Sequence, residues 1–354
     1  MNDHEHHRRE IEWPYHLLEP SMKPLRDWLE ERNQPKFRAD QIKKWIYQQG
    51  AASFDEMTDL PMNLRTKLSQ DFVLLRSKIA NHSKSSDGTE KLLLKLPDGA
   101  RIECVLIRDK ERRTCCVSTQ VGCGMGCVFC ATGMDGMKRN LTSGEIVEQL
   151  LQLRRLLPDG ERLSHVVVMG MGEPLANIVR LMPALKTANS EQGLGISARR
   201  ITISTVGLPK MINLLSDWGA TYHLAVSLHA PNDELRSRLV PTNEKIGIAD
   251  IVRAADRYFK TSGRRLTYEY VLLAGENDAP EHAQELVHLL KGRPALVNII
   301  PFNPVLGLPY RQPTKEQVHR FCAILQRGGL TVEVRQKKGD DINAACGQLR
   351  RTKS

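Results

Sequence analysis

Three closely spaced cysteines are the residues of this chain whose types and spacing most plainly allow chemistry. Cys123, Cys127 and Cys130 follow the spacing C-x3-C-x2-C, directly after a segment that reads as a β-strand. Cysteine thiolates are the ligands that iron–sulfur clusters use, so three on one short loop can each hold one iron of a four-iron cluster. The fourth iron would then lack a protein ligand and stay open to a small molecule. The spacing therefore predicts a four-iron, four-sulfur cluster with one open iron.

Two other uses of these cysteines fit the chain less well. A structural zinc site usually has four ligands, commonly two C-x2-C pairs or cysteines joined by nearby histidines. Cys116 could be a fourth ligand, but no second pair follows, and His165 lies well downstream. We expect no disulfide framework, because the sequence shows no secretory segment. The iron–sulfur interpretation is favoured.

The other five cysteines carry little signal by themselves. Alternation along a strand would turn Cys116 to the face opposite Cys115. Cys346 lies among small residues near the C-terminus, which could give a flexible segment access to a cavity. Free cysteine is typically a small buried hydrophobe, so the residues alone favour a core role for both. The same interpretation applies to Cys104, Cys115 and Cys322.

Strand-like and helix-like runs alternate over most of the chain. Helical patterns, for example 143–156 and 280–290, fall between the strands. Repeated β-then-α units predict a parallel sheet, and about six could curve into an open barrel. Chemistry in such folds gathers on loops after the strand C-termini, and the cysteine loop follows the first core strand. The predicted strands are 114–119, 165–170, 200–205, 223–229, 266–273, 297–301 and 330–335.

The N-terminal part has a different pattern. Apolar residues at helical spacing between Lys23 and Phe72 predict a small helical accessory domain. Two strand-like runs then flank Pro97-Asp98-Gly99, which is a turn sequence. His4, His6 and His7 could bind a metal, but a polar tail without apolar pattern favours disorder. The predicted organisation is a disordered tail (1–18), a helical, RNA-binding accessory domain (19–88), a β-hairpin linker (89–108), a core (109–343) and a C-terminal tail carrying Cys346 (344–354).

The bulk composition indicates a polyanionic partner. The 354 residues carry a formal net charge of +10, with a pI near 9.2. Phosphate neutralisation drives nucleic-acid affinity, although a solvated basic surface would give the same charge. Aromatic residues make up only 5%, so a stacking platform for single strands is not obvious. No apolar run is long enough to span a membrane, and we expect a cytoplasmic monomer without membrane contact.

Five ordered motifs narrow this interpretation. The cysteine spacing after the first strand of a partial barrel resembles the radical S-adenosylmethionine (SAM) superfamily. Within it, the chain resembles the RlmN/Cfr family of RNA methyltransferases, from roughly Lys23 to Leu349. This resemblance implies an α/β fold, namely a partial (β/α)6 radical SAM barrel with a helical accessory domain and a β-hairpin extension. The motifs are Cys116-Val-Ser-Thr-Gln-Val-Gly-Cys123, Gly170-Met-Gly-Glu-Pro174, Ser227-Leu-His-Ala-Pro231, Ile300-Pro-Phe-Asn303-Pro304 and Gly339-Asp-Asp-Ile-Asn-Ala-Ala-Cys346-Gly-Gln-Leu349.

The resemblance also implies the cofactors and their contacts. One 4Fe–4S cluster held by the three cysteines would bind SAM through its open iron, and two SAM molecules would be used per turnover. A lone turn glycine or strand-end histidine is more often structural, but these lie where barrel chemistry gathers. Glu173 would hold the SAM amino end, and Asn303 can donate and accept toward an adenine or ribose edge. The implied SAM contacts are Gly172, Glu173, Ser204, Ser227, Leu228, His229 and Asn303.

For Cys346, Cys116 and Glu103 the resemblance implies catalytic roles. Cys346 would be methylated by a first SAM, and its methyl carbon, activated by a radical, would join the adenine ring. Cys116 would then attack the sulfur, release the RNA and leave a Cys116–Cys346 disulfide. Glu103, on the second hairpin strand, would accept a proton.

The implied reaction is methylation of adenine C2 in 23S rRNA and in tRNA, with a flavodoxin- or ferredoxin-type electron donor. The glycine-acid turns at Gly172 and Gly339 resemble the C2-methylating branch more than the C8-methylating, Cfr-like branch. Two alternatives from other classes remain open. One is a radical SAM enzyme acting on a substrate other than RNA, and the other is a non-catalytic RNA-binding protein with a structural metal.

Overall fold

The computed structural model describes residues 14–350, so His4, His6 and His7 lie outside the described residues. The expected disordered tail 1–18 is too long, however. Tyr15–His16 form β1, which pairs in parallel with β2 (Phe72–Val73), and Leu17 and Leu18 are fully buried. Burial of the two leucine side chains stabilises the ordered conformation of this segment. A prediction of disorder from composition misses so short an apolar segment.

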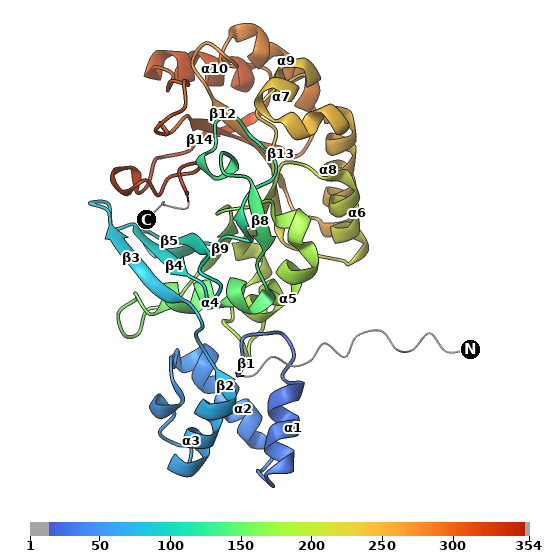
Figure 1. Ribbon diagram of the computed structural model, residues 1–354. Coiled ribbons are helices and arrows are strands. Elements are labelled where there is room, and N and C mark those ends of the chain that lie inside the picture. The colour runs from blue at the N-terminus through green and yellow to red at the C-terminus, as the bar shows by residue number, and fades with distance from the viewer. Residues whose placement is uncertain (1–13, 351–354) are drawn as a thin grey trace.

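A ten-stranded sheet forms the scaffold, in the order β14-β13-β12-β11-β10-β9-β6-β5-β4-β3 (Figure 1). Seven of these strands, from β6 through β9 to β14 in the sheet order, pair in parallel. The inner strands β9 to β13 are largely apolar, as expected where helices cover a parallel sheet, whereas β6 and β14 are more polar. This part confirms the predicted strands. The parallel strands are β6 (Arg112–Cys116), β9 (His165–Val168), β10 (Ile201–Thr205), β11 (His223–Ser227), β12 (Leu266–Leu272), β13 (Ala295–Pro301) and β14 (Thr331–Val334).

Helices follow the parallel strands and cover their outer face, which confirms the partial (β/α)6 barrel. A capping box between Thr142 and Glu145 starts α4, and another between Thr314 and Gln317 starts α10. A short turn, η6 (Pro241–Lys245), separates α7 from α8 in one crossover. The helices are α4 (Ser143–Arg154), α5 (Ile178–Asn189), α6 (Pro209–Asp217), α7 (Asp233–Leu239), α8 (Ile248–Ser262), α9 (Pro280–Leu290) and α10 (Lys315–Arg327).

Three antiparallel strands extend the sheet beyond β6. They are β3 (Lys78–Lys84), β4 (Glu90–Lys95) and β5 (Arg101–Asp109). The expected hairpin linker at 89–108 is therefore an integral part of the main sheet. The boundary at 88 is also wrong, because β3 belongs with β4. The sequence of β3, Lys-Ile-Ala-Asn-His-Ser-Lys, gives no apolar alternation, since this edge strand is mostly exposed.

The helical N-terminal unit lies at one end of the molecule (Figure 1). It comprises α1 (Lys23–Glu31), α2 (Phe37–Lys44) continued by the π-turn η1 (Trp45–Gln49), and α3 (Met62–Asp71). Its apolar core is continuous with that of the barrel, and polar contacts add to this connection. Glu148 on α4 accepts the Ser77 N–H at 2.7 Å, and Arg154 donates to the backbone carbonyls of Tyr47 and Gln48. Within residues 14–350, the model contains no helix with the length and apolar character needed to span a membrane.

Candidate active site

The expected site residues gather at one end of the barrel. The C-terminal ends of the parallel strands surround a cavity, as the fold requires. Leu228 is the exception among the expected SAM contacts, because its side chain is fully buried and does not line this cavity. The residues expected from the sequence that line it are Cys123, Cys127, Cys130, Gly172, Glu173, Ser204, Ser227, His229, Asn303 and Cys346.

The cysteine loop is the connection of a small hairpin, formed by β7 (Gln120–Gly122) and β8 (Met137–Asn140). The Cys123 N–H donates to Gly136 O at 3.2 Å, and the Val128 N–H donates to Leu239 O at the end of α7 at 3.1 Å. At Gly122 a Cβ would lie 2.0 Å from Gly136 O, and φ is +83°, so only glycine fits. The loop thus has a defined path between the hairpin and α7.

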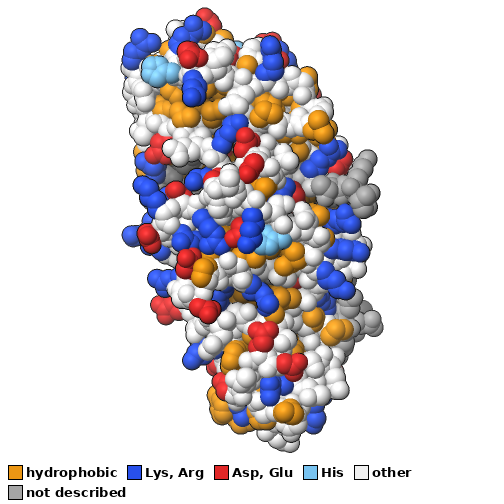
Figure 2. Space-filling model, turned by 90° about the vertical axis from the view of Figure 1, so that its left-hand side faces the viewer, with side chains coloured by type: hydrophobic (Ala, Val, Ile, Leu, Met, Phe, Trp, Pro, Cys, Tyr) orange, Lys and Arg blue, Asp and Glu red, His pale blue; other side chains and the backbone are white. Residues whose placement is uncertain are grey.

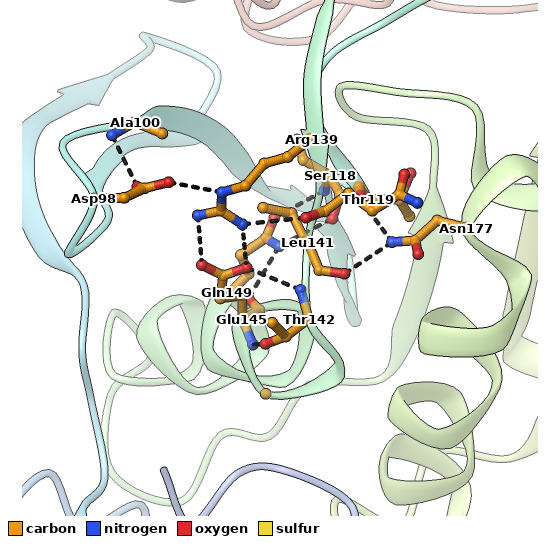
Figure 3. A network of polar contacts seen from close by, with 12 residues as sticks. Asp98, Ala100, Ser118, Thr119, Arg139, Leu141, Thr142, Glu145, Gln149 and Asn177 are labelled. Carbon is orange, nitrogen blue, oxygen red and sulfur yellow. Dashed lines mark hydrogen bonds and ion pairs between the residues drawn. The ribbon is translucent and has the colours of Figure 1, made fainter. Parts of the chain in front are cut away.

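Figure 3 shows the polar network that anchors this hairpin. Arg139 on β8 donates to both carboxylate oxygens of Glu145 at 2.8 Å and to Asp98 at 2.7 Å. Glu145 also accepts the Thr142 N–H, which completes the capping box of α4. Bidentate pairing of guanidinium with carboxylate is geometrically specific. One arginine thereby joins the hairpin to α4 and to the β4–β5 turn.

Two buried amides hold the other side of the hairpin (Figure 3). Asn177 donates to Thr119 O at 2.8 Å and to Leu141 O at 2.9 Å, on the two sides of the hairpin. Gln149 on α4 exchanges hydrogen bonds with the backbone of Ser118 at 2.8 and 3.0 Å. Buried backbone groups need such partners, so these amides fix where the loop starts and ends.

The three thiols fit a cluster better than a single metal ion. Within residues 14–350, no three His, Cys, Asp or Glu side chains converge on one ion. A four-iron cluster needs one thiolate for each of three separate irons, so such convergence is not required. Burial raises the pKa of Cys123 to about 11 and that of Cys127 further. Ligation needs thiolates, so cluster binding would release protons here.

The Gly172-Glu173 turn packs closely on Gln120. A Cβ on Gly172 would lie 2.6 Å from the Gln120 side chain, and φ is +100°. The glycine therefore permits this close packing, and since it also lines the cavity, its contact with SAM stays a prediction. The Glu173 carboxylate accepts the N–H groups of Leu175 at 2.9 Å and Val206 at 2.8 Å. Burial raises its pKa, and these hydrogen bonds oppose that shift.

Ser204 and Ser227 meet at a residue that the sequence did not single out. The two hydroxyls lie 3.3 Å apart, and Ser204 donates to the Glu269 carboxylate at 3.2 Å. Glu269 is buried on β12 directly opposite Ser227 in the sheet. A glutamate inside the apolar run 266–272 was the signal that could have identified it.

His229 is held in an unusual conformation at the end of β11. Its φ is +60°, and its carbonyl accepts from Asn277 at 2.8 Å. Nδ1 accepts the Val271 N–H at 3.1 Å, which leaves the ring proton on Nε2. Burial lowers the pKa of His229 to about 3, so the ring is neutral. Non-glycine residues at positive φ cluster at functional sites, which favours a ligand role over a purely structural one.

Asn303 provides the observation that tests the fit to SAM. Its amide nitrogen donates to Cys346 O at 3.0 Å. Its Oδ1 is buried and has no hydrogen-bond donor anywhere in the described part of the chain. A buried amide oxygen without a partner is energetically unfavourable unless a ligand supplies a donor. Since this oxygen belongs to a lining residue of the cysteine cavity, the residues present fit a ligand with N–H or O–H groups, as SAM has.

Cys116 and Cys346 lie together although 230 positions separate them in the chain. Both line a second cavity, which adjoins the first at Cys346, and both are free thiols. Burial, with a smaller effect of Cys346, raises the pKa of Cys116 to about 12, and burial also raises that of Cys346. Arg335, at the end of β14, opposes both shifts. Arg335 also lies 3.6 Å from Glu269, and the sequence did not single it out.

Glu103 lines neither cavity and is connected to the chain segment of Cys346 through the C-terminal residues. Its carboxylate accepts the Arg350 N–H at 2.8 Å and pairs with Lys91 at 2.8 Å. The segment around Cys346 is also held at Gly347, whose carbonyl accepts the Ala131 N–H at 2.8 Å. The segment around Cys346 is therefore held by several contacts in this structure, and its flexibility stays a prediction.

Comparisons with known proteins identify both parts of the chain. Residues 15–74 match the ribosomal RNA large subunit methyltransferase N-terminal domain, and residues 117–290 match the radical SAM superfamily. A "probable dual-specificity RNA methyltransferase RlmN" from Rhodopirellula baltica is 60% identical over 96% of this chain and 91% of its own length. The same description applies to a Symbiobacterium thermophilum relative, 46% identical over 93% of this chain and 90% of its own. A crystal structure of a radical SAM methyltransferase from Sphaerobacter thermophilus is 44% identical, with a TM-score of 0.91 over 95% of this chain and 99% of that one.

We predict that Arg139→Gln loosens the cysteine loop. Glu145 and Asp98 lose their cationic partner, so the free energy of unfolding should fall by about 2 kcal/mol. Iron bound after anaerobic reconstitution should fall with it. The control is Lys138→Gln, which removes an exposed charge from the neighbouring position. Denaturant titration and iron analysis measure both effects, and equal behaviour of the two variants would contradict this role of Arg139.

Proposed function

The chain belongs to the RlmN family of radical SAM RNA methyltransferases, and we propose that it methylates C2 of an adenine in 23S rRNA and in tRNA. Membership of the radical SAM superfamily brings a 4Fe–4S cluster and SAM as cofactors. We further propose that Cys123, Cys127 and Cys130 hold the cluster. Gly172, Glu173, Ser204, Ser227, His229 and Asn303 would surround SAM, while Leu228 would act through its backbone.

The observation that carries this proposal is the meeting of Cys116 and Cys346 beside the cysteine cavity. A radical SAM enzyme that acts on a protein or a small molecule would use the cluster and SAM. It would need no additional pair of thiols beside the three cluster cysteines. A non-catalytic RNA-binding protein would need neither the paired thiols nor the unpartnered Asn303 oxygen. Methyl transfer through a cysteine, followed by release through a second cysteine, uses all of these features.

Different residues of the chain carry out different steps of the proposed reaction. The bound cofactors supply the methyl group and the 5′-deoxyadenosyl radical, with two SAM molecules per turnover. Cys346 carries the methyl group on its sulfur and, after losing a hydrogen atom from that group, presents the carbon to the adenine ring. Glu103 would accept the proton from the ring position that is substituted, and the one unpaired electron left on the adduct would pass to the oxidised form of the electron-carrier protein. The backbone contacts of Cys346 with Asn303 and of Gly347 with Ala131 keep the carrier beside the cavity.

Release of the RNA falls to Cys116. Its thiolate attacks the Cys346 sulfur, the S–S bond forms, and the carbon–sulfur bond to the RNA breaks. The released carbon takes up a proton and becomes the methyl group. A flavodoxin- or ferredoxin-type protein would donate electrons, and the enzyme would act as a monomer. Methylation at C8 is the second candidate, since it would use the same scaffold.

The RNA would approach the face on which the C-terminal segment and β3 lie. Figure 2 shows Lys and Arg side chains across the middle of this face, mixed with acidic ones. The second cavity, which holds Cys116 and Cys346, has Arg112, Arg335, Lys337 and Lys338 in its wall against two acidic residues, Asp109 and Glu333. Phosphates would find positive charge at the entrance to the two thiols.

Mass spectrometry of adenosines in rRNA and tRNA tests this function directly. Cells with the protein should contain C2-methyladenosine in both RNAs, and cells that carry Cys346→Ala should contain none. Cys346→Ala should still assemble the cluster and cleave SAM, whereas Cys116→Ala should leave RNA covalently bound to the protein. Cys322→Ala, a buried cysteine on α10, serves as the control with full activity. Unchanged RNA methylation by Cys346→Ala would refute the proposal, and C8-methyladenosine would support the second candidate.

We predict that RNA release becomes faster as the pH rises. With the pKa of Cys116 near 12, the thiolate fraction grows about tenfold per pH unit over the neutral range. Arg335→Gln removes the charge that opposes this pKa shift, so more protein–RNA adduct should accumulate at pH 8. Arg335→Lys should restore most of the release, and Arg320→Gln on exposed α10 surface should change nothing. Gel electrophoresis of single-turnover reactions measures the adduct, and pH-independent release would contradict the assignment.

RNA affinity should depend on salt. Each phosphate contact on a single strand contributes about −0.7 to the slope of log affinity against log salt. Replacing both Lys337 and Lys338 by Gln should therefore flatten the slope by about 1.4. Lys260→Gln, an exposed position on α8, should leave it unchanged. Fluorescence anisotropy with a labelled RNA hairpin gives the slopes, and equal slopes would exclude this cavity as the phosphate contact.

A further inference from the structure

The carboxylate of Glu103 is engaged at both oxygens. Glu103 lies on β5 with only 3% of its surface exposed. Oε2 accepts the Arg350 N–H at 2.8 Å, and Oε1 lies 2.8 Å from Lys91 Nζ. One of these partners comes from the sheet and the other from the segment that follows Cys346. The side chain is therefore a junction between the two.

Lys91 contacts the same segment on the other side of Cys346. Its ammonium group donates to Asn343 O at 3.0 Å. Asn343 has a φ of +51° and directly precedes the short stretch that leads to Cys346. An ammonium group has three donors, so one lysine can hold the carboxylate and this carbonyl at once. The segment with Cys346 is thus fixed at both ends by a single ion pair.

The sheet register explains why Lys91 is in reach of Glu103. On β4, Lys91 pairs opposite Val105, and Leu93 pairs opposite Glu103. Lys91 and Glu103 are therefore diagonal neighbours on one face of the antiparallel pair, a separation that long side chains span. With 11% and 4% of their side chains exposed, the two groups are shielded from water. Removing one partner of such a pair leaves an uncompensated buried charge.

We propose that Lys91 is a positioning residue that joins the proton acceptor Glu103 to the chain segment carrying Cys346. Lys91 would then keep the proposed proton acceptor and the proposed methyl carrier in a constant relative position, although 243 positions separate them in the chain. The role of Glu103 as proton acceptor is part of the function proposed above, and this inference rests on it. The contacts that Lys91 makes with Glu103 and with Asn343 O do not depend on that function. We call these two contacts the Lys91 tie.

The charges around Glu103 mean that the contact with Lys91 also affects the pH at which Glu103 is protonated. Burial raises the pKa of Glu103, while Lys91 and the Arg350 N–H oppose that shift. Cys104, the next residue on β5, is also titratable, but burial raises its pKa strongly, so its thiol stays neutral. Lys91 is therefore the cation that favours the carboxylate form. Without it, Glu103 would hold its proton to a higher pH and could not accept another below that pH.

The experiment compares Lys91→Met, Lys91→Gln and Lys91→Arg with the control Lys95→Met, an exposed lysine on the same strand. Amide hydrogen exchange of the full chain needs neither cofactors nor RNA. In Lys91→Met the Arg350 amide and residues 343–347 should exchange at least tenfold faster than in the wild type. Lys91→Arg and Lys95→Met should exchange like the wild type, and Lys91→Gln, which keeps a donor, should fall between.

The pH profile of RNA methylation is the second measurement. In Lys91→Met and Lys91→Gln the acidic limb should move to higher pH, and Lys91→Arg should bring it back. Exchange rates and an acidic limb identical to the wild type in both uncharged variants would overturn the inference. If the wild type itself makes no C2-methyladenosine, the proposed function fails, while faster exchange in Lys91→Met would still support the tie to the C-terminal segment.

Discussion

The site depends on how the ends of the parallel strands are held after their pairing stops. Strands diverge at the rim of an open barrel, and their last N–H and C=O groups need new partners. The backbone of Val206, just past β10, is held from both sides. Its N–H donates to Glu173 at 2.8 Å, and its C=O accepts from Arg236 at 2.5 Å. Arg236 also donates to Leu228 O and Ser227 O, at 3.0 and 3.2 Å. Two buried charged side chains thus join the ends of β9, β10 and β11.

The same arrangement supports the cysteine loop. Arg236 lies on α7, and the end of this helix accepts the Val128 N–H through Leu239 O. Thr242, in the turn that follows, donates to Met125 O at 3.1 Å. A buried guanidinium is stable only with its donors satisfied, and Arg236 bonds carbonyl and amide oxygens alone. Its positive charge is left facing the cysteine side, where it opposes the rise in the pKa of Cys127. Strand ends, helix and loop therefore form one polar unit.

The sequence predicted the barrel because each β-then-α unit carries its own apolar pattern. The resemblance to the RlmN/Cfr family supplied the residues that meet at the rim, and parallel strands that end at the same edge bring them together. It could not supply contacts such as Ser204 with Glu269 or Lys91 with Glu103, because these depend on register between strands. The edge strand β3 was not predicted from the sequence, because an exposed strand needs no apolar alternation. For Gly172 the structure adds a packing reason that the sequence could not supply, because its missing Cβ makes room for Gln120.

Burial of Cys116 and Cys346 has two opposite effects on the same chemistry. High thiol pKa values keep both sulfurs protonated, and thiol–disulfide chemistry proceeds through the thiolate. Two neighbouring thiols in a resting enzyme are thereby protected from premature pairing. The same protonation would slow the attack by which, in the proposed function, Cys116 releases the RNA. Arg335 lies where it opposes both pKa shifts, and its own position depends on Glu269, which also accepts from Ser204. The balance between protection and release is thus tied to the strand ends that form the cofactor cavity.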